Sequence, residues 1–404
     1  MGQYLGYFKS RKSIAAFLID GVGLVAGMWV ETGAGSVLRD SSGDMPLSAE
    51  QRALLPGQAP AWLAFEQGDG PPKLLFHQPL QPDKVLDKAL TNHGFKRKRL
   101  QIYGAIRHFF HTRTFLEVDT PVAVLNPGTE PFLDTFPVGD LWLRTSPELH
   151  MKRLLGEGFD QIFQMGACFR RGDVGSWHRE EFTMLEWYRC FADLDKIAED
   201  VAAMLAELSH LAEDPVYFQT PPEHVTCVEL FQRHLNLQLR DCSHRQPLQK
   251  ALEDRGIGVD PEDDWDTLYF LLFLNFIEPY LGADRPVMVS GYPASQAALA
   301  KLAPVEPGKM PTCYRMEVYL RGGLELANGF YELTDENEQR QRFAEDAAKR
   351  KAMNKAVYAN DEAFLASLGR GLPPCAGIAL GVDRLVAALL NQPSLKNILP
   401  FESQ

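Results

Sequence analysis

Apolar residues recur along the chain in two different rhythms, and the rhythm changes near residue 85. Before that point the apolar runs are short, as in Leu24 to Val30 and Pro60 to Phe65, and clusters of Gly, Asp and Pro separate them. Short runs with such boundaries are typical of strands. We therefore predict a small, mostly β module over residues 1–85, which ends in a Pro-rich linker at His77 to Lys84.

Helical periodicity begins in the segment Lys88 to Thr112. Ile102, Ile106 and Phe109 recur at the spacing of one helix face, and basic residues fill the opposite side. A long amphipathic helix is therefore expected where the β module ends. The basic run Lys96 to Arg99 is interpreted as a solvated face of this helix.

A charged loop lies between two strand-like arms in the stretch Gly166 to Arg189. The apolar residues before Arg170 and the run FTMLEWY after the loop predict a β-hairpin. Arg170 stands where the first arm meets the loop and can direct a planar, permanently charged guanidinium at a phosphate. Phe182 on the returning arm offers a ring on which a base can stack. The hairpin is therefore a candidate nucleotide site.

A second unusual stretch is MEVYLRGGLELANGFYELTD, residues 316–335. It alternates like two buried strands joined by a turn at Arg321 to Gly323, with Glu317, Glu325 and Glu332 in phase for a shared site. Carboxylates on buried strands are costly unless cations or metal ions neutralise them. The pattern therefore indicates a cation-binding site.

Two further stretches place charged groups at predicted helix starts. In TSPELHMKRLL, residues 145–155, a proline precedes Glu148, so this carboxylate is expected in the first helical turn. In GIALGVDRLVAALL, residues 377–390, a strand rich in glycine runs into a helix that begins near Arg384. The start of a helix favours anions, so Arg384 is a candidate phosphate ligand.

Composition narrows the class of protein. The chain has 404 residues, 45% hydrophobic content and a formal net charge of −12, which fits a globular protein with one large and one smaller domain and argues against a wide nucleic-acid surface. Its six cysteines form no CxxC pair, so neither a zinc site nor a disulfide framework is expected, and the cytoplasm fits best. The apolar run Ile14 to Val30 is interrupted by Asp20, which argues against a signal peptide or a membrane span.

These motifs resemble those of class II aminoacyl-tRNA synthetases. FLEVDTP at residues 115–121 is similar to motif 1, the hairpin around Arg170 to motif 2, and the stretch around Arg384 to motif 3. EFTMLEWYR and ELANGF are closest to the lysine branch, and GYPASQAALAKLA at residues 291–303 resembles the elongation factor P lysine ligases, paralogues of lysyl-tRNA synthetase that attach a lysine-type amino acid to a protein. The resemblance implies an α+β fold, with a class II synthetase-like catalytic domain over residues 86–404 in which helices flank an antiparallel sheet.

The resemblance also implies how ATP is bound. Arg170 and Arg384 would be the catalytic groups, Arg170 between the amino acid carboxylate and the α-phosphate and Arg384 at the γ-phosphate. The other predicted ligands of the nucleotide and of its magnesium are Phe182 under the adenine, His178 at the terminal phosphates, Asp173 at the adenine amino group, and Glu317 with Glu325 on Mg²⁺. Asp173 stands one place later than the usual motif 2 acid. The two metal glutamates are eight residues apart where the family usually has seven, so one residue, expected to be a glycine, must loop out.

A lysine-type amino acid is the implied substrate. Glu332 and Tyr188 match the residues that hold its distal ammonium, Glu148 and Glu186 those near the other amino group, and Asn328 the residue at its carboxylate. Phe330 and Ala379 are expected in the same pocket. The family of protein ligases typically has this alanine where lysyl-tRNA synthetases have glycine, and its methyl group is expected to favour (R)-β-lysine over α-lysine.

The sequence is compatible with three functions. The preferred one is a ligase that forms a lysyl-type adenylate and passes it to a lysine side chain of elongation factor P. A lysyl-tRNA synthetase whose N-terminal module binds the anticodon is the first alternative, although no basic, aromatic strand surface supports it. A non-catalytic paralogue is disfavoured because Arg170, Arg384, Glu325 and Glu332 are all present. Motif 1 implies a homodimer, and the N-terminal module is either an oligonucleotide-binding-type barrel or an appended β unit of unknown role.

Overall fold

The chain divides into two compact units, Met1–Arg97 and Lys98–Gln404. A computed structural model describes residues 17–19, 22–32, 35–40, 43–55, 57, 59–67, 71–79, 93–128, 130–305 and 310–399. The predicted domain boundary near residue 85 and most of the predicted linker lie outside these residues, and His77 to Pro79 belong to a strand.

The N-terminal unit is built around one antiparallel sheet, as the short apolar runs predicted. Its strands follow the order β4-β3-β2-β5-β6, and β1 pairs with the start of β2. The bounds of its elements are β1 Phe17–Ile19, β2 Val22–Thr32, β3 Gly35–Asp40, β4 Gly43–Pro46, α2 Ala49–Ala53, β5 Ala61–Gln67 and β6 Lys73–Pro79. Trp29, Leu38 and Phe65 form part of its core. The described pairings form an open path, so they do not test whether the unit is a closed barrel.

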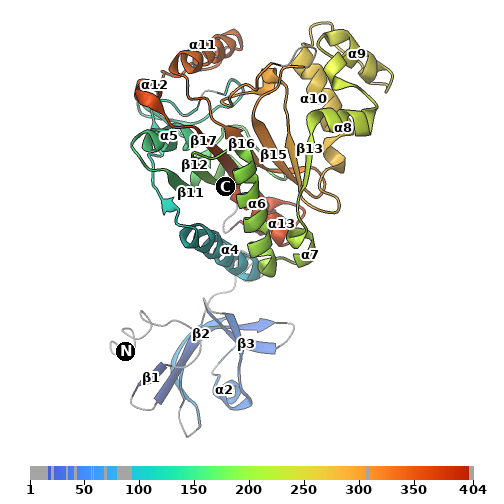
Figure 1. Ribbon diagram of the computed structural model, residues 1–404. Coiled ribbons are helices and arrows are strands. Elements are labelled where there is room, and N and C mark those ends of the chain that lie inside the picture. Colours follow the sequence, from blue (N-terminus) through green and yellow to red (C-terminus); the bar gives the residue numbers. More distant parts are fainter. Residues whose placement is uncertain are drawn as a thin grey trace. The chain divides into compact units, whose positions relative to one another are not determined.

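The larger unit contains an eight-stranded sheet in the order β13-β14-β15-β16-β17-β12-β11-β7 (Figure 1). The central pairs are antiparallel, and only the outer pairs β13 with β14 and β11 with β7 are parallel. In sheet order the bounds are β13 Glu223–Thr226, β14 Val287–Ser290, β15 Arg315–Leu320, β16 Leu324–Tyr331, β17 Cys375–Gly381, β12 Glu181–Cys190, β11 Gln161–Phe169 and β7 Leu116–Glu117. A small second sheet consists of β8 Ala123–Val124, β10 Leu141–Leu143 and β9 Pro137–Val138.

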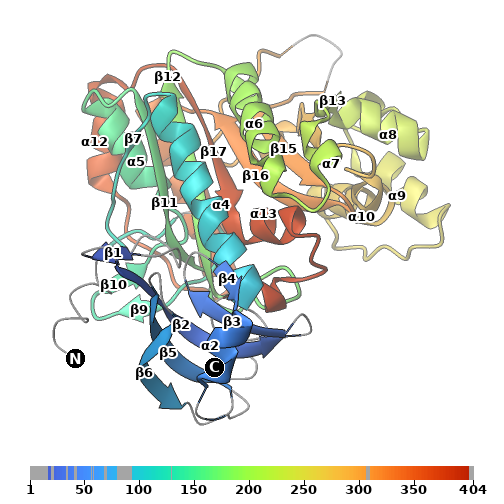
Figure 2. The same ribbon diagram turned by 90° about the horizontal axis from the view of Figure 1, so that it is seen from below.

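Helices flank the large sheet. Their bounds are α4 His93–Thr112, α5 Glu148–Gly156, α6 Leu194–Leu208, α7 Pro215–Gln219, α8 Cys227–Leu235, α9 Arg245–Glu253, α10 Trp265–Phe276, α11 Glu336–Ala352, α12 Glu362–Gly371 and α13 Val382–Leu389. Figure 2 shows α4 and α6 crossing one face of the sheet. Within the described ranges, none of the helices has the length and apolar content needed to cross a membrane. This architecture confirms the predicted α+β class.

Side chains that alternate along β12 place core residues on one face of the sheet and predicted site residues on the other. Phe110 of α4 stacks on Phe163 of β11 and contacts Trp187 of β12, so these side chains fill the layer between the sheet and the helix. The neighbouring residues Glu186 and Tyr188 must then point to the opposite face, because successive strand side chains alternate. The apolar periodicity of the long helix is confirmed, since Ile102, Ile106 and Phe109 are fully buried.

The predicted motif hairpin and helix starts are all present. β11 and β12 pair over their whole length on either side of the charged loop. Glu148 is the first residue of α5, and Arg384 lies in the first turn of α13, directly after β17. The hairpin β15-β16 turns at Arg321 to Gly323, where Gly322 and Gly323 have positive φ.

The extra residue of the β15-β16 hairpin is not a looped-out glycine, contrary to the prediction. The register changes between Val318, which pairs with Ala327, and Tyr319, which pairs with Glu325. Leu326 therefore has no partner and forms a β-bulge. A bulge absorbs one residue without inverting the rest of the strand, so Glu325 and Asn328 stay on the same face although they are three positions apart.

Candidate active site

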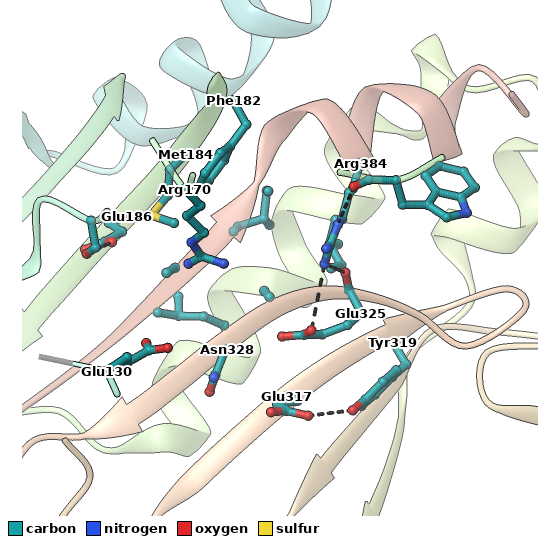
Figure 3. A pocket seen from close by; sticks show the side chains of 18 of the residues that line it. Glu130, Arg170, Phe182, Met184, Glu186, Glu317, Tyr319, Glu325, Asn328 and Arg384 are labelled. Atoms are coloured by element: carbon teal, nitrogen blue, oxygen red, sulfur yellow. Dashed lines mark hydrogen bonds and ion pairs between the residues drawn. The ribbon is translucent and has the colours of Figure 1, made fainter. Parts of the chain in front are cut away.

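A cavity of about 400 Å³ opens on the face of the sheet opposite α4, and the predicted site residues converge there. Its lining includes every residue that the sequence predicted for ATP, magnesium or amino acid: Glu148, Arg170, Asp173, His178, Phe182, Glu186, Tyr188, Glu317, Glu325, Asn328, Phe330, Glu332, Ala379 and Arg384. These residues come from the loop and second strand of the β11-β12 hairpin, from β15, β17, and β16 with the residue after it, and from α5 and α13. Figure 3 shows Glu186 and Arg384 at opposite ends of the cavity.

Cross-strand register explains why distant residues meet. Ala379 of β17 pairs with Glu186 of β12 on one side and with Asn328 of β16 on the other, and Asn328 in turn pairs with Glu317 of β15. Directly opposed residues present their side chains on the same face. One row across four strands therefore carries two carboxylates and an amide, with the methyl group of Ala379 between Glu186 and Asn328.

The next row carries the aromatic groups. Gly377 pairs with both Tyr188 and Phe330. A side chain at this glycine would meet the Tyr188 ring, since an added Cβ would lie 2.2 Å from its Cδ1. The glycine therefore gives Tyr188 room to lie across β17 beside the acid row.

A buried lysine, which the sequence analysis did not assign, pairs with two of the acids that were predicted to bind the amino acid. The ammonium of Lys152 lies 2.5 Å from carboxylate oxygens of both Glu148 and Glu332, and its side chain is 1% exposed. Burial alone would lower the pKa of Lys152, but the two carboxylates outweigh it and raise the pKa, so the group is an ammonium. Its position four residues after Glu148 on α5 was the available sequence signal.

Glu186 lies beside the two ion pairs of Lys152 and is 1% exposed. It accepts hydrogen bonds from the hydroxyl groups of Ser146 and Tyr188. Burial, reinforced by Glu148, raises the pKa of Glu186 to about 8, and burial raises the pKa of Glu332 to about 7 in spite of Lys152. The ionised site carries three carboxylates and one ammonium, which leaves two negative charges for a ligand to neutralise.

Arg170 lies between the two ends of the cavity, immediately after β11. Its backbone NH donates to Glu180 O at 2.8 Å, and its guanidinium lies over the Phe182 ring at 5.1 Å. Among the residues that the structure describes, the buried Nε of Arg170 has no hydrogen-bond partner. A buried guanidinium donor without a partner is costly, so the group is suited to an anionic ligand.

Arg384 lies at the end of the cavity opposite Glu186 and contacts several residues there. Its guanidinium donates to Glu325 O at 2.7 Å and to Trp177 O at 3.3 Å, and it contacts the ring of His178. Burial and Arg384 lower the pKa of His178. Asp173 lies 4.0 Å from the other nitrogen of that ring, so the hairpin loop brings both side chains to the end of the cavity where Arg384 lies.

The two predicted metal glutamates are in different environments. Glu325 faces Arg384 at 3.8 Å, and enclosure in the cavity, reinforced by Glu317, raises the pKa of Glu325 to about 7. Glu317 forms an ion pair with Arg315 and accepts hydrogen bonds from Tyr292 at 2.6 Å and Tyr319 at 2.5 Å. Glu325 therefore fits a ligand of magnesium, whereas both oxygens of Glu317 already have donors.

The interpretation of the basic run on α4 as a solvated face is wrong for Arg99. Arg99 is 7% exposed and forms an ion pair with Asp383, whose other oxygen accepts from the backbone NH of Thr183 at 2.8 Å. Asp383 precedes Arg384, and Thr183 follows Phe182. Arg99 thus joins α4 to α13, which carries Arg384, and through Asp383 to β12, which carries Phe182. Nothing in a run of four basic residues distinguished it.

Comparison with known proteins agrees with this geometry. Residues 90–404 match the family model of class II tRNA synthetases (D, K and N). The elongation factor P-(R)-beta-lysine ligases of Hamiltonella defensa and Pectobacterium carotovorum are each 41% identical to the chain, over 317 and 316 residues, and that of Sodalis glossinidius is 40% identical over 316 residues. In each case the match covers 75% of this chain and 93% of the relative. The chain belongs to the class II tRNA synthetases and, within them, to the family of the elongation factor P-(R)-beta-lysine ligases.

Proposed function

We propose that the chain is an ATP-dependent ligase that activates a lysine-type amino acid, preferably (R)-β-lysine, and transfers it to a lysine side chain of elongation factor P. The observation that carries the proposal is the charge of the amino acid end. Glu148, Glu186 and Glu332 with Lys152 leave two negative charges, which match the two ammonium groups of a diamino acid. Desolvated charges need such pairing.

Activation is a displacement at phosphorus. A carboxylate oxygen of the amino acid attacks the α-phosphorus of ATP, the bond to the β-phosphate oxygen breaks, and pyrophosphate leaves. Arg170 stabilises the charge that develops between the carboxylate and the α-phosphate, and Arg384 with His178 binds the terminal phosphates. Phe182 offers the ring on which the adenine stacks, and the Arg170 guanidinium lies 5.1 Å from the centre of that ring.

Magnesium is proposed as the companion of ATP, where it would neutralise phosphate charge. Glu325 is the residue suited to hold it. Glu317 was predicted as the second ligand, but its ion pair with Arg315 and its two tyrosine donors suit it better to orienting β15 behind the site. No step of the chemistry depends on Glu317 in this proposal.

Transfer forms an amide. The acceptor ammonium loses a proton, its nitrogen attacks the carbonyl carbon of the adenylate, the bond from that carbon to the phosphate oxygen breaks, and AMP leaves. The amine gives up a second proton as the amide forms. The net charge of −12 suits a protein acceptor better than the phosphate backbone of tRNA.

The test is a comparison of acceptors. The purified chain is incubated with ATP and with lysine or (R)-β-lysine, and either elongation factor P or tRNA is added. Mass spectrometry should find one added aminoacyl residue on a lysine of elongation factor P, and acid precipitation should find tRNA essentially uncharged. Efficient charging of tRNA would favour a lysyl-tRNA synthetase, and absence of pyrophosphate exchange would favour a non-catalytic paralogue.

A homodimer is also proposed, on the resemblance of residues 115–121 to motif 1. Large apolar side chains in and after this segment are exposed, with Leu116, Val122 and Leu125 at 50%, 41% and 64%. Exposed apolar groups that cluster along one segment are typical of an interface. Light scattering of the purified chain should give the mass of two copies, and the variant Leu125→Glu should give the mass of one.

A further inference from the structure

Glu130 lines the catalytic cavity, yet no motif accounts for it. It lies in the segment between β8 and β9, and Figure 3 shows its carboxylate reaching into the cavity at the end where Glu186 lies, away from Arg384. The residue is exposed, and its carboxylate forms no hydrogen bond or ion pair with another residue of the described ranges. An unpaired carboxylate at the mouth of an acid-rich cavity calls for a cationic partner.

The backbone around Glu130 is held in place on both sides. Pro127 O accepts from the NH of Thr145 at 3.0 Å and from its hydroxyl at 2.7 Å. On the other side, the guanidinium of Arg350, which is 2% exposed, donates to Glu130 O at 3.2 Å and to Leu133 O at 2.6 Å. These donors anchor the backbone at Pro127, Glu130 and Leu133, and backbone anchored by buried donors presents its side chain in a defined place.

The negative charge of Glu130 is not needed to balance the amino acid substrate. The buried acids together with Lys152 already balance the two ammonium groups of a diamino acid. Glu130 adds one more negative charge, and this charge is solvent-accessible rather than buried. The reaction contains one further amine, the ε-ammonium of the acceptor, which must enter from solvent to reach the activated carboxylate near Asn328.

We propose that Glu130 binds the ε-ammonium of the acceptor lysine and guides it to the adenylate. The inference rests on the proposed function, because it assumes a lysine side chain as acceptor. It assigns no bond making to Glu130. The carboxylate pairs with the incoming cation, and the protons of the amine pass to water as the amide forms.

The experiment uses Glu130→Gln, which keeps the size of the side chain and removes its charge. Three acceptors of the preformed adenylate are compared: elongation factor P, Nα-acetyl-lysine amide, and hydroxylamine, which is neutral at pH 7. Glu157→Gln is the matched control, since Glu157 is exposed and does not line the cavity. Amino acid-dependent pyrophosphate exchange is measured on all three proteins.

Glu130→Gln should lower kcat/KM for both lysine acceptors by roughly tenfold, the effect of losing one hydrogen bond to a charged group. It should leave hydroxylamine capture, pyrophosphate exchange and the KM for the amino acid unchanged, and added salt should reduce transfer less than in the wild type. Equal losses with hydroxylamine, or a raised KM for the amino acid, would overturn the proposal. If the wild type modifies Nα-acetyl-lysine amide but not elongation factor P, the proposed protein acceptor is wrong, and the comparison of Glu130 variants still decides its role.

Discussion

Lys152 and Glu332 form an ion pair of 2.5 Å in which both side chains are only 1% exposed. The same ammonium lies 2.5 Å from Glu148, so one lysine holds two of the three acids of the amino acid end in place. Removing one partner of a buried pair leaves an uncompensated buried charge. This arrangement makes the stability of α5 and the affinity for the substrate depend on the same group.

Lys152→Met should therefore lower the free energy of unfolding by about 3–5 kcal/mol, as is usual when a buried ion pair loses one partner. The measurement is urea denaturation at pH 7. Lys152→Met combined with Glu332→Gln should recover part of that loss, because the stranded carboxylate is gone. A double variant as unstable as the single one would show that packing rather than charge explains the effect.

The affinity for the amino acid should rise with pH. Burial raises the pKa of Glu186 to about 8, so the free site holds this carboxyl largely protonated below that pH, whereas an ammonium ligand favours its ionised form. The KM for the diamino acid should fall as the pH rises from 6 to 8.5, and binding at pH 7 should release protons. Calorimetry in buffers of different ionisation enthalpy measures that release.

Glu186→Gln supplies the control for the pH dependence. It keeps an acceptor for Ser146 and Tyr188 but cannot ionise. Its KM should be higher and should change less with pH over the same range. An unchanged pH profile would assign the titration to another group, of which Glu332, with its pKa raised to about 7, is the first candidate.

Arg170→Ala should reduce amino acid-dependent pyrophosphate exchange by roughly a hundredfold or more, since it removes charge stabilisation at the reacting phosphate. Arg170→Lys should recover only part of this rate, because an ammonium lacks the planar fork of donors. Circular dichroism checks that both variants are folded. Exchange at the wild-type rate by Arg170→Ala would contradict the assignment of the hairpin as the nucleotide site.

Ala379 should determine which lysine is preferred. Its methyl group stands between Glu186 and Asn328 in the cross-strand row, so it takes space where an α-amino group would lie. We expect (R)-β-lysine to be used better than α-lysine by roughly ten- to two-hundredfold, the discrimination available from one methyl group in a pocket. Ala379→Gly should narrow the ratio by improving α-lysine. Pyrophosphate exchange with both isomers measures it, and equal use by the wild type would contradict the idea.

The parts of the fold predicted from sequence were those with a strong local pattern. The period of Ile102 and Ile106 indicated α4, and the alternating arms on either side of Arg170 indicated β11 and β12. In the N-terminal unit β3 and β4 were missed, because Gly35–Asp40 and Gly43–Pro46 are short and contain few apolar residues. Periodicity gives little signal in such strands.

The site residues differ in the same way, since those in a local sequence motif were predicted and those that act through a distant partner were not. The predicted ligands all line one cavity. They could be predicted because each of them lies in a sequence motif of the family. Lys152, Arg99 and Arg315 were missed, since each acts through an ion pair with a residue that only folding brings to it. Glu130 carried no signal at all, because it lies in an irregular segment whose position depends on Arg350, more than two hundred residues later.

The bulge at Leu326 has a bearing on how this site tolerates insertions. One added residue in a plain strand would move every later side chain to the other face. Here the bulge at Leu326 absorbs the extra residue, so Asn328 still pairs with Glu317 and Ala379. An added residue between Glu317 and Glu325 therefore does not alter the position of Asn328 in the amino acid pocket. For the same reason, the spacing between the two glutamates is a poor guide to which of them contacts the ligand. Deleting one residue of the Arg321 to Gly323 turn would allow the ladder to close without the bulge, and Leu326 would then take the face that Glu325 now occupies.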